Sequence, residues 1–251
     1  MTDALLVQDL TKTFRRLRAE PVEAVRGLSF SVQAGHIFGL LGPNGAGKTT
    51  TLRILTTLIR ASSGRAEVAG VDVARDPLGV RRRIVVVVQE SAAEIFLTVR
   101  DNLLTFGRFH GLHGQDLKRR ADEVMEQFGL TQDASRKAMD LSGGFRRRIQ
   151  VAKALLVQTP VVFLDEFSTG MDPILKRSVM GLLREQARQG RTIVLTTQIL
   201  HEAEALCDDI LIINRGREVA RGDVPAIKAL SATHNASLED VFVEMMREDV
   251  R

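Results

Sequence analysis

Tryptophan and tyrosine are absent from this 251-residue sequence, and cysteine occurs once. No apolar run approaches the roughly 18 residues needed to span a bilayer, and the N-terminus lacks the pattern of a secretory signal. The single Cys207 excludes an intramolecular disulfide and a metal site made of cysteines alone. We expect it to be a buried small hydrophobic residue, in a protein of a reducing compartment. The missing aromatic residues argue against a surface that stacks single-stranded nucleic acid.

Charge is nearly balanced, because 35 Lys and Arg residues oppose 31 Asp and Glu residues, for a net charge of +4. This excess does not require a nucleic-acid partner, although it suits phosphate ligands or an anionic membrane surface. Two arginine runs, at residues 81–83 and 146–148, are only three residues long and contain no aromatic residue. We interpret both runs as solvated faces.

Strand-like apolar runs alternate with segments of helical periodicity along most of the chain. The runs 85–88 and 161–164 are apolar on both faces, which is typical of strands in a sheet that is covered on both sides. The alternation indicates an α/β fold with a largely parallel sheet. Strands are predicted over residues 5–10, 22–32, 36–41, 84–88, 161–164, 192–197 and 210–213, and helices over residues 48–59, 149–158, 174–188 and 200–207.

The middle of the chain differs, because residues 98–138 contain only helical periodicity, with Thr98 as the predicted N-cap. We therefore predict a helical subdomain of about residues 91–139, inserted into a single sheet-containing domain. The remaining domain boundaries are predicted at 1–90 and 140–224 for the core and 225–251 for a short helical tail.

Residues 42–49 read Gly-Pro-Asn-Gly-Ala-Gly-Lys-Thr and fit the phosphate-loop pattern G-x-x-x-x-G-K-[ST]. The motif follows a predicted strand and precedes a predicted helix, as a phosphate loop must. Its glycines let the backbone form a concave nest of N–H groups, and the helix N-terminus adds partial positive charge. We expect Lys48 to reach the β- and γ-phosphates of a nucleotide and the Thr49 hydroxyl to bind Mg²⁺.

A second candidate element is Asp165 and Glu166, which end the apolar run 161–164. Acidic residues at the carboxyl end of a parallel strand face the ligand crevice. We expect Asp165 to hold Mg²⁺ through water and Glu166 to polarise the water that attacks the γ-phosphate. Alone, the pair would fit an ordinary acidic turn equally well, but the phosphate loop favours the catalytic interpretation.

Residues 141–145, Leu-Ser-Gly-Gly-Phe, lie just before a predicted helix. A serine hydroxyl and two glycines at a helix start make a second anion site. Two phosphate-binding elements in one chain indicate that one of them serves a nucleotide held by a partner chain.

Together these motifs resemble the ATP-binding cassette (ABC) family of transporter nucleotide-binding domains, in family order and over roughly residues 4–220. The resemblance implies an α/β P-loop NTPase fold of ABC type, with a largely parallel sheet, an antiparallel β edge and an inserted helical subdomain. It also implies ATP and Mg²⁺ as ligands. The implied catalytic residues are Glu166, Gln198 and Gln89, and the implied metal ligands are Thr49, Gln89 and Asp165. The implied nucleotide contacts are Phe14, Gly42, Asn44, Gly45, Ala46, Gly47, Lys48, Thr49, Thr50, Ser142, Gly143, Gly144 and Asp172.

The family resemblance also implies partners. It implies a head-to-tail homodimer in the ATP-bound state, in which each ATP lies between the phosphate loop of one chain and Ser142 and Gly144 of the other. Residues 196–208 and 237–242 look like exporters of the daunorubicin-resistance type, which pair with a separate ABC-2-type membrane permease. The expectation is thus an ATPase subunit on the cytoplasmic face of the membrane that drives export of a drug-like, lipid or other substrate, with no nucleic-acid partner.

Three positions depart from the common family pattern. Gln198 replaces the usual switch histidine, and glutamine can hydrogen-bond a phosphate but carries no charge. Phe145 replaces the usual signature glutamine, and Phe167 replaces a proline, which we expect to loosen the following D-loop (168–172). Phe14 is expected to stack on adenine, although residues 15–21 are predicted to form an extra loop.

Three other functions fit the sequence less well. A soluble ABC protein of translation or DNA repair would carry two cassettes or a long coiled coil, whereas 93 residues without sustained heptads separate Lys48 from Leu141. A GTPase would need a guanine-reading N-K-x-D, and the nearest string, 214–217, does not fit. A regulatory cassette with low turnover is favoured by Gln198 and opposed by Glu166.

Overall fold

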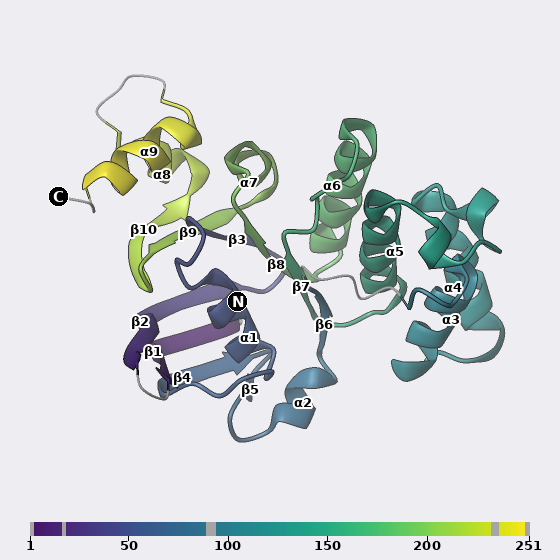
Figure 1. Cartoon of the computed structure of the whole chain (residues 1–251), viewed down its shortest axis with the longest axis horizontal. Coiled ribbons are helices and arrows are strands. Elements are labelled where there is room, and N and C mark those ends of the chain that lie inside the picture. The colour runs from purple at the N-terminus through teal and green to yellow at the C-terminus, as the bar shows by residue number, and fades with distance from the viewer. Residues whose placement is uncertain (1–2, 17–18, 89–93, 232–235, 249–251) are drawn as a thin grey trace.

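The computed structural model describes residues 3–16, 19–88, 94–231 and 236–248. Its centre is a six-stranded sheet of order β10-β9-β3-β8-β7-β6. All neighbouring strands in it run parallel except β10, which pairs antiparallel with β9 at the edge (Figure 1). The strands are β3 (Ile37–Leu41), β6 (Ile84–Val87), β7 (Val161–Asp165), β8 (Thr192–Thr197), β9 (Asp209–Asn214) and β10 (Arg217–Asp223).

A second, antiparallel sheet of order β2-β1-β4-β5 lies on one side of the first (Figure 1). The prediction of a loop at residues 15–21 is wrong for the residues that the structure describes. Arg15 and Arg16 belong to β1 and residues 19–21 belong to β2, so they continue the long hairpin. Strand β4 is absent from the prediction because half of its residues are polar and exposed. The strands are β1 (Asp3–Arg16), β2 (Ala19–Gln33), β4 (Ser63–Val68) and β5 (Val71–Asp72).

The two faces of the parallel sheet bury different cores. Along β7, Val161 and Phe163 pack with the antiparallel sheet and helix α1, whereas Val162 and Leu164 pack with the helices of the opposite face. Side chains of a strand point alternately to its two faces, so a strand that is apolar at every position serves both cores. The helices of the core are α1 (Lys48–Leu55), α2 (Pro77–Arg81), α5 (Gly143–Leu156), α6 (Pro173–Arg188) and α7 (Leu200–Leu206).

Helix α1 ends earlier than the predicted residue 59, because Thr57 adopts the left-handed conformation (φ 62°) that stops helices. Helix α5 begins six residues before the predicted position 149. Its start is set by Ser142, whose Oγ accepts a hydrogen bond from the Phe145 N–H at 3.2 Å.

Between strand β6 and helix α5, the described residues form helices and turns, and α3 and α4 pack against α5 at one end of the molecule (Figure 1). The predicted N-cap Thr98 is confirmed, since its hydroxyl accepts from the Asp101 N–H at 3.0 Å. Here lie α3 (Val99–Phe109), α4 (Gly114–Gln127) and the 3-10 turns η1 (Thr131–Asp133) and η2 (Ala138–Asp140).

Of the last two helices, α8 (Val224–Lys228) packs on β10 and on α9, and α9 (Leu238–Glu248) packs on α7. Lys228 Nζ lies 2.8 Å from Glu204 of α7, which ties the tail to the core. Among the residues described, no helix is long and apolar enough to cross a bilayer.

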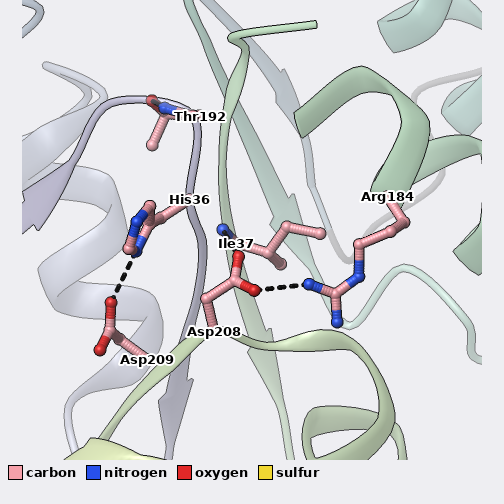
Figure 2. A network of polar contacts seen from close by, with 7 residues as sticks. His36, Ile37, Arg184, Thr192, Asp208 and Asp209 are labelled. Carbon is pink, nitrogen blue, oxygen red and sulfur yellow. Dashed lines mark hydrogen bonds and ion pairs between the residues drawn. The ribbon is translucent and has the colours of Figure 1, made fainter. Parts of the chain in front are cut away.

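A polar network fixes the start of β3 (Figure 2). The Asp208 carboxylate accepts from the Ile37 N–H at 2.8 Å and from Arg184 of α6 at 2.5 Å. The neighbouring Asp209 lies 2.8 Å from Nδ1 of His36. These contacts join β3, β9 and α6 at the end of β3 opposite the phosphate loop, so they hold the strand that delivers that loop.

The single cysteine is buried as predicted. Burial raises the pKa of the Cys207 thiol, with Asp208 and Asp209 adding to the shift. Its Sγ would lie 2.7 Å from a Cβ at Gly39 of β3, so α7 packs directly on the strand.

Candidate nucleotide-binding site

The loop between β3 and α1 has a backbone that requires glycine. Gly42 (φ 154°), Gly45 (φ 79°) and Gly47 (φ 108°) all have positive φ. A Cβ at Gly42 would lie 2.2 Å from the Ile213 carbonyl oxygen, and one at Gly47 would lie 2.4 Å from that of Ala24. Any side chain at Gly42 or Gly47 would thus displace the loop, which confirms the strand–loop–helix context expected of the motif.

Lys48 begins α1 and is 5% exposed. Its Nζ donates hydrogen bonds to the carbonyl oxygens of Gly42 (2.6 Å) and Pro43 (3.0 Å). Burial lowers the pKa of Lys48, while the nearby Glu166 and Asp165 oppose that shift. Residues 44–50 line a cavity of about 160 Å³ together with Ala24 and Glu166. The cavity is therefore lined by the glycine-rich loop and by a buried cation, a combination suited to phosphate.

Asp165, the last residue of β7, is 4% exposed, and the Thr196 hydroxyl of β8 donates to its carboxylate. Asp165 and Thr49 both line an adjoining cavity of about 370 Å³, whose wall includes Val88. A carboxylate and a hydroxyl fit Mg²⁺, which binds proteins through one or two oxygen ligands and completes its shell with phosphates and water. Val88 precedes Gln89, which lies outside the described residues.

Glu166 has φ 48°, a left-handed conformation that costs energy for a residue with a side chain. Its N–H donates to the Thr196 carbonyl at 3.0 Å, and its side chain lines the phosphate cavity. The turn thus aims Glu166 at the ligand cavity while Asp165 remains buried beside it.

The signature segment lies on the other face of the parallel sheet from α1, because α5 packs in the opposite core (Figure 1). Ser142 and Gly143 are exposed. A Cβ at Gly144 would lie 2.1 Å from the Gly170 carbonyl oxygen, so the signature helix and the D-loop approach each other closely.

The other predicted site residues are more dispersed. Asp172 is exposed and caps α6 by accepting from the Leu175 N–H at 2.9 Å, a bond that lowers its pKa. Gln198 is exposed directly after β8. Phe14 lies on β1 with 38% of its surface exposed and Lys12 Nζ 5.1 Å from its ring centroid. Phe14 does not line the phosphate cavity, and its stacking on adenine stays a prediction.

The interpretation of residues 146–148 as a solvated face is wrong for Arg147, which is 6% exposed. Its guanidinium reaches the backbone that carries Glu166. Successive residues of a helix point about 100° apart, so one member of a basic run can face inward, and the adjacent acidic strand end is the signal that could have revealed it. Phe167 is also buried (1% exposed). Side-chain packing therefore fixes this position, at which the family usually has proline.

A loop of this geometry between a parallel strand and a helix, with two acids at the end of a neighbouring strand, defines a phosphate-loop nucleotide-binding protein. The sequence profile of the family described as ABC transporter matches residues 25–169. The chain belongs to this family of ATPases.

Several relatives agree with this placement. The doxorubicin resistance ATP-binding protein DrrA of Mycobacterium tuberculosis is 41% identical over 248 residues, which cover 99% of this chain and 72% of the relative. Daunorubicin resistance ATP-binding protein DrrA2 of Streptomyces coeruleorubidus is 44% identical over 221 residues, 85% of this chain and 69% of the relative. A solved ATP-binding subunit of an ABC transporter is 28% identical with a TM-score of 0.87, covering 97% of this chain and 99% of that structure.

Proposed function

We propose that this chain hydrolyses ATP to drive the export of drug-like molecules through a separate ABC-2-type permease, from the cytoplasmic face of the membrane. The observation that carries the proposal is the pairing of a phosphate loop and Glu166 on one side with an exposed signature segment on the other side of the sheet. The names of the relatives support drug export as the use of that ATPase.

In the proposed reaction, the loop N–H groups and Lys48 bind the β- and γ-phosphates. Thr49, Asp165 and Gln89 would hold Mg²⁺, which would supply charge neutralisation at the phosphate oxygens. The Glu166 carboxylate accepts a proton from the attacking water, and Gln198 donates a hydrogen bond to the γ-phosphate. Because Glu166 lines the phosphate cavity, it lies within the region where that water must be positioned.

A head-to-tail homodimer would complete the site. Ser142, Gly143 and Asp172 are exposed, although the first caps α5 and the last caps α6. Exposed polar groups at helix starts suit a phosphate brought by a second copy of the chain. We propose that Ser142 and Gly144 contact the γ-phosphate of ATP bound to the partner's loop.

An apolar patch made of Ile95, Phe96 and Met139 supports docking of a permease. These side chains are 41%, 72% and 49% exposed. The Met139 N–H donates to the Ile95 carbonyl at 2.9 Å, which holds the two segments together. Ile95 and Phe96 follow Gln89 by six and seven residues in the sequence, so a partner bound at this patch would contact the chain close to Gln89 in sequence. Contiguous exposed apolar surface is typical of protein interfaces.

The test is a tagged pull-down of the chain from detergent-solubilised membranes of its source cells, with bound proteins identified by mass spectrometry. We expect a permease with about six membrane-spanning helices, in stoichiometric amount. Phe96→Asp should abolish the recovery, because burial of an unpaired charge opposes docking.

The matched control is Phe109→Asp. Phe109 is 85% exposed at the far end of α3, about 15 Å along the helix from its start. It should leave recovery unchanged. Recovery of ribosomes or nucleic acid in place of a permease would contradict the export proposal, and equal loss with both variants would contradict the docking patch.

A further inference from the structure

Arg147 of α5 makes an unusual set of contacts. Its Nη2 donates to the carbonyl oxygens of Glu166, at 2.7 Å, and of Asp165. Its Nε donates to the Phe167 carbonyl at 3.2 Å. One buried guanidinium thus binds three consecutive carbonyls of the strand end that carries the two candidate acids.

The remaining guanidinium nitrogen extends the contact to a third segment. Nη1 donates to the Gln150 side chain at 2.8 Å and to the carbonyl of Val88, which precedes Gln89. The fixed, planar fork of arginine makes such a multipoint contact possible, and a lysine ammonium cannot reproduce it. Arg147 therefore joins the signature helix to the backbone of Glu166 and to the entry of the Gln89 segment.

The contacted backbone needs such support. Glu166 has a strained left-handed conformation, and residues 166–168 leave the ladder of β7. Strained residues persist only where their surroundings hold them. The carbonyl bonds of Arg147 act on the turn itself, and the Glu166 side chain lines the phosphate cavity.

We propose that Arg147 is a positioning residue for ATP hydrolysis, which fixes the backbone turn of Glu166 and couples it to the signature helix. The inference rests on the proposed role of Glu166. Because α5 starts at Ser142, a shift of that helix when a second chain supplies its nucleotide would be transmitted through Arg147 to the residue that activates water. The rate of ATP hydrolysis would then depend on whether the signature segment contacts the nucleotide held by the second chain.

The test compares Arg147→Lys with Arg191→Lys in the full chain. Arg191 is a matched control, because it is 8% exposed and binds the carbonyls of Thr159 (3.0 Å) and Ala154 (3.2 Å) and a glutamine side chain. It lies before β8, at the end of that strand opposite Thr196. Both variants lose a buried multipoint contact, but only one loses it beside Glu166.

We expect Arg147→Lys to lower kcat for ATP about tenfold or more, with KM changed less than about threefold, because ground-state binding by the phosphate loop is retained. Arg191→Lys should lower Tm while kcat, measured below its Tm, stays within about twofold. A KM increase with unchanged kcat, an unchanged kcat, or equal kcat losses in both variants would overturn the proposal.

A milder variant covers the case in which Arg147→Lys does not fold. Gln150→Leu keeps the arginine and removes one of its acceptors, so we expect a kcat loss of about threefold at unchanged KM, and no loss would overturn the proposal. Glu166→Gln is measured in parallel. Turnover retained by Glu166→Gln would refute the assigned role of Glu166, whereas an inactive Glu166→Gln with a fully active Arg147→Lys would refute only the positioning role.

Discussion

At the scale of single residues, burial of a charged side chain makes the stability of the fold depend on pH. Lys153 of α5 is 6% exposed, with its Nζ 5.7 Å from the ring centroid of Phe106. Burial lowers its pKa to about 8 from the ordinary 10.5, although the Glu94 charge opposes the shift. Above pH 8 the folded chain therefore releases a proton that the unfolded chain still holds.

This difference predicts a pH dependence of stability. Because the unfolded state binds more protons between pH 8 and 10.5, the contribution of Lys153 to the free energy of unfolding rises with pH in that window and is lost as pH falls through 8. Relative to the parent chain, the free energy of unfolding of Lys153→Met should be higher at pH 7 than at pH 10, by about 2.5 kcal/mol at most. Urea unfolding of both proteins at the two pH values measures this, and a pH-independent difference would contradict it.

At the scale of elements, the D-loop is held by α7. The Ser168 hydroxyl donates to Glu202 Oε2 at 2.6 Å, and Lys176 Nζ of α6 lies 2.6 Å from Oε1. Glu202 is 1% exposed and Ser168 is 2% exposed. The turn after Glu166 is thus held by Arg147, which binds the carbonyls of residues 165–167, and by the buried Ser168–Glu202 hydrogen bond after it, so these contacts supply stiffness without a proline at position 167.

The same helix supplies a matched pair for testing this anchor. Glu202→Gln should lower the free energy of unfolding by about 1–3 kcal/mol, because it leaves Lys176 and a buried hydrogen-bond network incompletely paired. Glu204→Gln removes the half-exposed pair with Lys228 and should cost less than about 1 kcal/mol. Urea denaturation distinguishes them, and equal costs would mean that the buried anchor does not stabilise the D-loop.

Prediction from sequence succeeded where a local pattern alone determines the structure. The phosphate loop needs glycine backbone angles and a following helix, and both were readable in Gly42–Lys48. The all-apolar β7 was equally readable, because burial on two faces leaves no polar position. Strand β4 and the inward direction of Arg147 were missed, since each depends on which distant segment packs against it. The position of Phe14 relative to a nucleotide has the same dependence and stays a prediction.

At the scale of the whole molecule, the contact of Cys207 with Gly39 joins the last part of the chain to its central sheet. Helix α7 packs on β3, and the tail helix α9 packs on α7. The thiol can become accessible only when this packing opens, and its raised pKa keeps it protonated in the folded chain.

The single thiol of the chain therefore reports when the packing of α7 on the sheet opens. Because the sequence contains no second cysteine, a thiol-reactive dye added to the native chain should label it at the frequency with which α7 separates from the sheet. We expect modification to be slow and to accelerate in parallel with urea unfolding, which mass spectrometry of the labelled chain would measure; rapid labelling without denaturant would contradict it. A cysteine introduced at any exposed position would therefore be the fastest-labelled thiol of the folded chain, because the native Cys207 is buried.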